Sequence, residues 1–238
     1  MKKVCLSLLL IGSFYNLLAQ KTISDANAEK RDVSGFHGIN VATGIKLIIS
    51  EGETEQVVVS ADKLEYREKI ITRVEKGILK IYYENKFGAI NDRKEKKELK
   101  AYVSYKMLDE LDANTGAQVE IDGTLKSTSL KMNVNTGAIL KGAVKTDDLI
   151  VDQNTGSVIT LSGETAKLDV DGDTGSMFKG IDLKTDNCSV RISTGAGVYI
   201  TVQKELYVKA STGGFVKYKG DAGVRETKTN TGGSVSKI

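Results

Sequence analysis

The 238 residues are 40% hydrophobic and 27% charged, which is enough apolar material for one large domain or two small ones. Lysine and arginine number 34 against 31 acidic residues, so the chain lacks the basic footprint that nucleic-acid binding needs. Proline is absent although about 12 would be ordinary. Because proline cannot donate to a β-ladder, its absence favours strands that are paired on both sides.

The N-terminal segment, 1–20, is typical of a secretory signal. Lys2 and Lys3 precede a mostly apolar run over residues 4–18, and the small residue Ala19 follows it. The run is short for a membrane span and is interrupted by polar residues, so we favour cleavage over an N-terminal anchor. No later stretch of the sequence is apolar enough to cross a membrane. The mature chain then carries 32 basic and 31 acidic residues, a net charge of +1, and one cysteine, Cys188.

Residues 21–106 alternate between strand-like runs and turns without a fixed period. The segments QVVVSA, ILKIYYEN and ELKAYVSY are rich in β-branched and aromatic residues and predict strands. Asp62 is suited to cap a short helix over residues 62–69, and residues 85–98 predict a charged loop. We interpret this half as wide, irregular coils that begin a stack and cap its N-terminal edge. A separate small β-domain is the alternative, although no linker rich in proline, glycine or serine supports it.

From residue 107 onwards, a Thr-Gly step recurs at a nearly constant interval. Asn, Asp or Ser precedes each threonine, and glycine supplies the positive φ that a sharp corner needs. The repeat threonines are Thr115, Thr136, Thr155, Thr174, Thr194, Thr212 and Thr231. An internal period of about 20 residues is typical of repeat architectures. Each of these steps is therefore predicted to be a corner of the chain.

Aligned on the threonine, the repeats agree in columns that alternate between apolar and polar residues. The position four after the threonine is always apolar, as at Leu140, Ile159 and Phe178, and the position two after it is always small. A period of two predicts strands with one face inside, and short strands at a fixed interval bury that face only by stacking. We predict an all-β fold, a right-handed parallel β-helix with coils of about 18–21 residues, regular over 107–238 and continuous over 33–238. A β-sandwich with Thr-Gly turns is the alternative.

The chain offers little that indicates catalysis. His37 is its only histidine and Cys188 stands in an apolar column, so we interpret both as structural. We predict no enzyme, no catalytic or cofactor-binding residue and no cofactor. A β-helix that acts on glycans, as polysaccharide lyases and hydrolases do, is the alternative. Successive coils differ by at most three residues, however, which leaves little material for the walls of a cleft.

One polar column changes sign along the repeats. Its members stand three residues before each threonine and are Asp112, Asn133, Asp152, Asp171, Arg191, Lys209 and Lys228. Asp152 and Asp171 are expected about 5 Å apart, where like charges repel, and a weakly bound cation such as Ca²⁺ would relieve that repulsion. The glycine-rich nonapeptide repeat that binds Ca²⁺ is absent, so we favour nearby lysines and solvent and assign no metal site.

The column three after each threonine predicts an interaction surface. Since the adjacent apolar column points inward, this column points outward and carries Ile139, Val158, Met177 and Phe215. Contiguous exposed apolar side chains mark contacts with partners. We predict that these four residues, the apolar stripe, serve self-association or bind a protein or glycan at the cell surface. A bulge that shifts the register would bury them instead.

Gly38-Ile39-Asn40 lies in the run FHGINV and is followed by GIKLIISEGETEQVVVSADK. This stretch resembles the head GIN domain family of putative auto-transporter adhesins, and the Thr-Gly repeats are similar to that family over residues 33–238. The resemblance implies a right-handed β-helix in exported proteins of Bacteroidetes-type bacteria, with no established activity. We therefore expect an exported protein of the periplasm, the outer-membrane surface or the medium, acting as an adhesin, a surface-binding module or a purely structural component.

Overall fold

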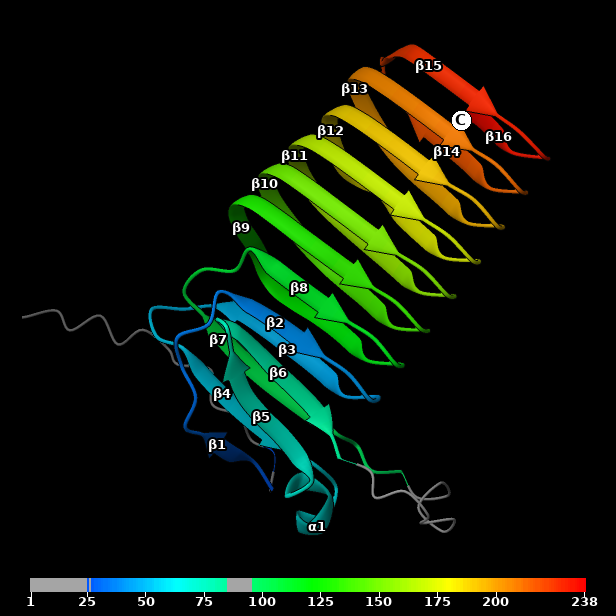
Figure 1. Ribbon diagram of the computed structural model, residues 1–238. Coiled ribbons are helices and arrows are strands. Elements are labelled where there is room, and N and C mark those ends of the chain that lie inside the picture. The colour runs from blue at the N-terminus through cyan, green and yellow to red at the C-terminus, as the bar shows by residue number, and fades with distance from the viewer. Residues whose placement is uncertain (1–24, 26, 85–95) are drawn as a thin grey trace, which may run out of the picture.

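The computed structural model describes residue 25, residues 27–84 and residues 96–238. This part of the chain forms 16 strands of one sheet and one short helix, wound into a stack of parallel coils, which is a β-solenoid (Figure 1). The predicted fold class is therefore confirmed. The predicted signal peptide, residues 1–20, lies outside the described residues, as do residues 85–95 of the predicted charged loop. In the described part, no helix is long and apolar enough to cross a membrane.

Each regular coil is one long strand that begins after a Thr-Gly turn and ends before the next. Each of these strands pairs in parallel with the strands of the coils on either side of it. The long strands are β9 (Gln118–Val134), β10 (Ile139–Gln153), β11 (Val158–Gly172), β12 (Met177–Ile192) and β13 (Gly197–Ala210). The short strand β8 (Glu110–Ala113) precedes them, and the short strands β14 (Phe215–Lys219), β15 (Gly223–Thr229) and β16 (Ser234–Lys237) follow them. The coil after β13 is divided between the short strands β14 and β15, and β16 begins a further coil after the turn at Thr231 and Gly232.

The interior is built from vertical rows of apolar side chains. Leu140 pairs with Ile159, and Ile159 pairs with Phe178, so the three lie one above another on successive coils. All three are fully buried, and burial of each such side chain contributes about 1.5–3 kcal/mol. One period of the Thr-Gly repeat is therefore one turn of the solenoid, as the sequence predicted.

The Thr-Gly corners are type I′ turns. At the corner that begins with Asn135, φ is 54° at Thr136 and 69° at Gly137, and Ala138 N donates to Asn135 O at 3.1 Å. Positive φ was predicted for glycine only. The structure places the threonine there too, which is rare for a β-branched residue and costs roughly 1–3 kcal/mol. Gly137 N also donates to Thr155 O at 2.9 Å, so consecutive turns bond to one another along the solenoid.

In the N-terminal part, the order along the chain differs from the order in the stack. The coil of β2 (Gly38–Val41) and β3 (Lys46–Glu51) lies between the coil of β8 and β9 and the coil of β6 (Ile78–Tyr83) and β7 (Lys100–Tyr105). The chain therefore leaves the stack after β3 and returns to it on the far side.

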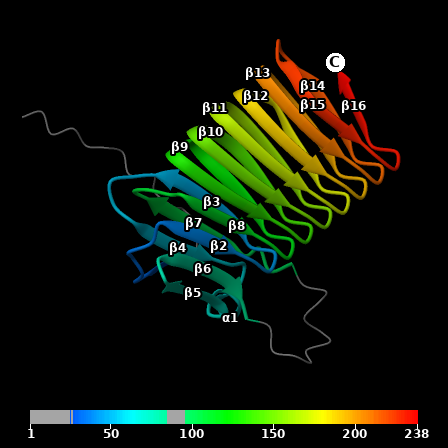
Figure 2. The same ribbon diagram turned by 45° about the horizontal axis from the view of Figure 1, so that its top comes forward.

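Three antiparallel strands cover this end of the stack (Figure 2). β4 (Gln56–Ser60) pairs with β7, β1 (Glu29–Arg31) pairs with β4, and β5 (Ile70–Glu75) pairs with β6. Unpaired edges of parallel strands invite further chains, and a change to short antiparallel strands stops the parallel ladder.

The helix α1 (Leu64–Arg67) is shorter than the predicted 62–69, and its predicted cap is wrong. Its N-cap is Lys63, which makes no side-chain hydrogen bond to the helix. Asp62 N instead donates to Lys97 O at 3.0 Å, which holds Asp62 in the extended segment before the helix.

Candidate functional site

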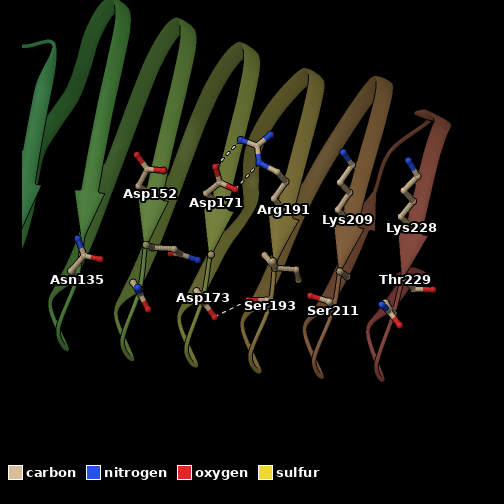
Figure 3. Close-up of a pocket in the computed structure, with 16 residues that line it drawn as sticks. Asn135, Asp152, Asp171, Asp173, Arg191, Ser193, Lys209, Ser211, Lys228 and Thr229 are labelled. Carbon is tan, nitrogen blue, oxygen red and sulfur yellow. Dashed lines mark hydrogen bonds and ion pairs between the residues drawn. The ribbon is translucent and has the colours of Figure 1, made fainter.

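The Thr-Gly turns form one edge of the solenoid and separate two outer faces. One face is formed by residues that precede the turns in the chain, and it carries the polar column that changes sign. We call this column the charge ladder. The structure places its members on successive coils in one register: Asp112, Asn133, Asp152, Asp171, Arg191, Lys209 and Lys228. Strand pairing sets neighbouring members about 4.8 Å apart. Figure 3 shows the side chains from Asp152 to Lys228 projecting to one side from consecutive coils.

A groove of about 580 Å³ runs beside the charge ladder, close to the turns (Figure 3). Its second wall consists of the residues that precede the threonines: Asn135, Asn154, Asp173, Ser193, Ser211 and Asn230. The Asp173 carboxylate accepts hydrogen bonds from Ser193 Oγ at 2.8 Å and from Thr174 N at 2.7 Å. Hydrogen bonds from Thr194, Ser193 and Thr174 lower the pKa of Asp173. The groove is therefore polar along both walls.

Basic side chains relieve the predicted repulsion between Asp152 and Asp171. Arg191 donates two hydrogen bonds to Asp171, from Nε at 2.8 Å and from Nη2 at 2.7 Å. Lys131 Nζ lies 3.9 Å from an oxygen of Asp152. In the described part of the chain, no group of three His, Cys, Asp or Glu side chains is placed to hold a metal ion.

A second outward row lies two residues before the charge ladder on the same strands. Its members are Glu110, Lys131, Ile150, Asp169, Ser189, Tyr207 and Glu226. Ile150 is 40% exposed and Tyr207 is 39% exposed. The sequence analysis missed this row, although the period of two that located the charge ladder also locates it.

The apolar stripe lies on the other face, after the turns. Ile139 pairs with Val158 and Val158 with Met177, so these three stand on consecutive coils. Ile139 is 45% exposed, and the other members of the stripe are half-buried. Gly197 stands between Met177 and Phe215 in this row.

The side chains on either side of Gly197 cover it. A Cβ at Gly197 would lie 2.4 Å from Cζ of Phe215 and 2.9 Å from Cε of Met177. The Phe215 ring also meets Tyr199 edge to face, with ring centres 5.8 Å apart. The apolar surface therefore continues across the glycine from Ile139 to Phe215.

His37 and Cys188 lie apart from both faces. His37 Nδ1 is 2.7 Å from Asp109 Oδ1, and the hydrogen bond and charge of Asp109 raise the pKa of His37. Cys188 is buried in the interior, and that burial raises the pKa of its thiol. The structure thus joins neither residue to the groove or to the apolar stripe.

The fold defines a class of protein, a β-solenoid with two long outer faces of different chemistry and antiparallel strands at its N-terminal end. Solenoids use such faces for extended contacts. The chain belongs to the family of putative auto-transporter adhesins that is defined by the head GIN domain, and the sequence model of that family matches residues 35–222.

Solved structures share this fold. A putative adhesin from Bacteroides fragilis NCTC 9343 is similar with a TM-score of 0.74 and 14% identity, over 89% of this chain and 96% of that one. A putative adhesin from Parabacteroides merdae ATCC 43184 gives 0.66 and 16%, over 90% and 97%. A putative lipid binding protein from Parabacteroides distasonis ATCC 8503 gives 0.63 and 17%, over 90% and 97%. Identities this low show the fold alone, and none of the curated proteins matches the chain.

Proposed function

We propose that the protein is an exported, non-catalytic module that binds a partner at the cell envelope, in the periplasm, on the outer-membrane surface or in the medium. Three features support this proposal. The chain belongs to an adhesin-like family, its segment 1–20 has the pattern of a secretory signal, and its outer faces are long and open. Open faces suit extended contacts better than they suit the closed pocket of an enzyme.

The apolar stripe is the observation that carries the proposal. Ile139, Val158 and Met177 occupy equivalent outward positions on three consecutive coils, and Phe215 extends the row across Gly197. An apolar row that is partly exposed on a rigid sheet costs solubility unless something covers it. The stripe is therefore proposed as the contact surface for an envelope partner, either a protein or a glycan, or for a second copy.

The charge ladder supports a binding role over catalysis on glycans. Glycoside hydrolysis needs two carboxyl groups that face each other across a sugar. Asp152 and Asp171 instead stand side by side in one row, and Arg191 holds Asp171 through two hydrogen bonds. These carboxylates are thus placed for ion pairing.

The stripe is tested by the double substitution Ile139→Lys and Met177→Lys. We expect binding to isolated envelope fractions to fall at least about tenfold, since two desolvated charges would enter the contact. Thr128→Lys with Ala166→Lys adds the same charge at exposed positions away from both faces and is the matched control. Sedimentation of the same variants shows whether the stripe contacts a second copy. If envelope binding and the oligomeric state were both unchanged, the stripe would not be a contact surface.

The predicted location needs its own experiment. Cells are fractionated, and intact cells are treated with protease before the protein is detected. We expect a chain that lacks the segment 1–20 in the envelope or the medium. A full-length chain in the cytoplasm would contradict export.

A further inference from the structure

The charge ladder has two pairs of opposite charges at equal distances from a point between Asp171 and Arg191, and a third, outer pair formed by the neutral Asn133 and Lys228. Asp171 and Arg191 are adjacent members, and the midpoint between them is the centre of the six members from Asn133 to Lys228. Asp152 lies one coil before Asp171, and Lys209 lies one coil after Arg191. A second copy of this row that runs in the opposite direction therefore places a basic member opposite Asp152 and opposite Asp171.

We propose that two copies of this chain pair through this face, with their solenoids running in opposite directions. The two copies are related by a two-fold axis that lies between their facing surfaces and runs parallel to the strands. This axis reverses the order of the coils in the second copy, and each column of one copy faces the same column of the other. Such a contact is isologous, so each pairing occurs twice. Placing the axis between the coils of Asp171 and Arg191 brings Asp171 to Arg191 of the second copy and Asp152 to Lys209 of the second copy.

Asp152 and Lys209 are available for this contact. The side chain of Asp152 is 44% exposed, and Lys131 approaches it only to 3.9 Å. Lys209 is exposed, and no hydrogen bond or ion pair within the described residues occupies its ammonium group. The hydrogen bond and charge of Lys228 lower the pKa of Glu226, and the charge of Lys209 adds only a smaller contribution. Both groups would therefore gain a partner without losing a strong one.

The second outward row has the same self-complementarity. With the same axis, the exposed side chain of Ile150 meets the exposed ring of Tyr207 of the second copy. Lys131 meets Glu226 of the second copy, which is a further opposite-charge pair. The two rows are linked within each chain by the pairs of Lys131 with Asp152 and of Lys228 with Glu226. Both rows select the same axis, one mainly by charge and the other by both charge and apolar contact.

The extent of the face fits a stable but modest contact. Six coils overlap, and strand spacings give about 1,200 Å² buried in total, at the lower limit for specific interfaces. At the edge of this contact, Asp148 faces Glu205 of the second copy, which is a pair of like charges. Arg225 already donates to Glu205 at 3.1 Å and offsets that charge. We therefore expect dimerisation that strengthens as salt is lowered.

The proposal is tested by charge reversal and exchange. In sedimentation equilibrium, Asp152→Lys alone and Lys209→Asp alone should each weaken dimerisation at least about tenfold, because two like-charge pairs replace two attractive ones. The double variant with both substitutions should recover dimerisation. Within one chain the two residues are three coils apart, about 14 Å, so recovery cannot come from an internal pair. Lys184→Asp, at an exposed position outside this face, is the control.

The orientation is tested by crosslinking. Ile150→Cys and Tyr207→Cys are made in separate chains, and Cys188 is buried and does not compete. A short bis-maleimide should link the two variants when they are mixed and should link neither variant to itself, because like positions lie about 14 Å apart across the axis. Self-linking of either variant, a monomer at every concentration, or no recovery in the exchanged variant would each overturn the proposal. These variants leave the apolar stripe intact, so this proposal and the proposed function fail separately.

Discussion

The guanidinium group of Arg191 reaches across to the preceding coil and holds the carboxylate of Asp171 through two hydrogen bonds of 2.8 and 2.7 Å. The hydrogen bond and the charge of Asp171 raise the pKa of Arg191. Because Asp152 stands next to Asp171 in the same row, Arg191 also offsets the repulsion between two carboxylates.

Arg191→Gln should therefore lower the free energy of unfolding by about 0.5–1 kcal/mol at low salt, since the pair is exposed but bidentate. Urea unfolding in dilute samples at 0.02 M and 0.5 M NaCl would measure the loss. Adding Asp171→Asn should recover most of it, because the repulsion with Asp152 disappears. A loss that grows with salt would contradict this account.

Thr155 has a φ of 50° in its type I′ turn. Asparagine tolerates this conformation much better than a β-branched residue does, so Thr155→Asn should raise the free energy of unfolding by about 0.5–1 kcal/mol. Thr160→Asn, on the exposed side of β11, is the control and should give no gain. Thermal unfolding of both variants measures the change in melting temperature. Equal changes in the two variants would show that strain in the turn does not explain the gain at Thr155.

Gly180 makes room for the ring of Phe178. A Cβ at Gly180 would lie 2.5 Å from Cε1 of that ring, which is fully buried. Gly180→Ala should therefore cost about 1–3 kcal/mol of stability through overpacking. In a chain that already carries Phe178→Leu, the same substitution should cost clearly less. An equal cost in both chains, measured by denaturant unfolding, would rule out this clash.

The pair between His37 and Asp109 predicts a dependence of stability on pH. Asp109 raises the folded-state pKa of His37 above its ordinary value of 6.5. The resulting stabilisation is fully present below that value and is lost as pH rises through the higher folded-state pKa. Both side chains are more than 40% exposed, so the effect should be only a few tenths of a kcal/mol. Denaturant unfolding at pH 5.5 and pH 8.5 measures the free energy of unfolding of the native protein and of His37→Asn. The difference in this free energy between the two proteins should be larger at pH 5.5.

Part of the candidate site could be predicted from the sequence because side-chain direction in a strand follows a period of two. That period and the threonine spacing placed the charge ladder from Asp112 to Lys228 on successive coils and directed Ile139, Val158 and Met177 outward. The row that contains Ile150 and Tyr207 was within reach of the same reasoning. The bidentate pairing of Arg191 with Asp171 was not, because it depends on the conformations of long side chains.

The sequence by itself determined the stacked β-architecture. Short strands that repeat small, apolar and turn-forming residues at a fixed period bury their apolar columns by stacking successive coils. Only the tertiary structure decided how the solenoid ends. The coil of β6 and β7 comes after the coil of β2 and β3 in the chain, but it lies nearer the N-terminal end of the stack. Antiparallel strands pair with it at that end. Pairing between distant segments is set by the edges and packing that the whole fold leaves available, and no local pattern in residues 21–106 records that choice. The positive φ of the threonines is likewise known only from the structure, because it runs against the preference of a β-branched residue and occurs where each turn bonds to the next coil.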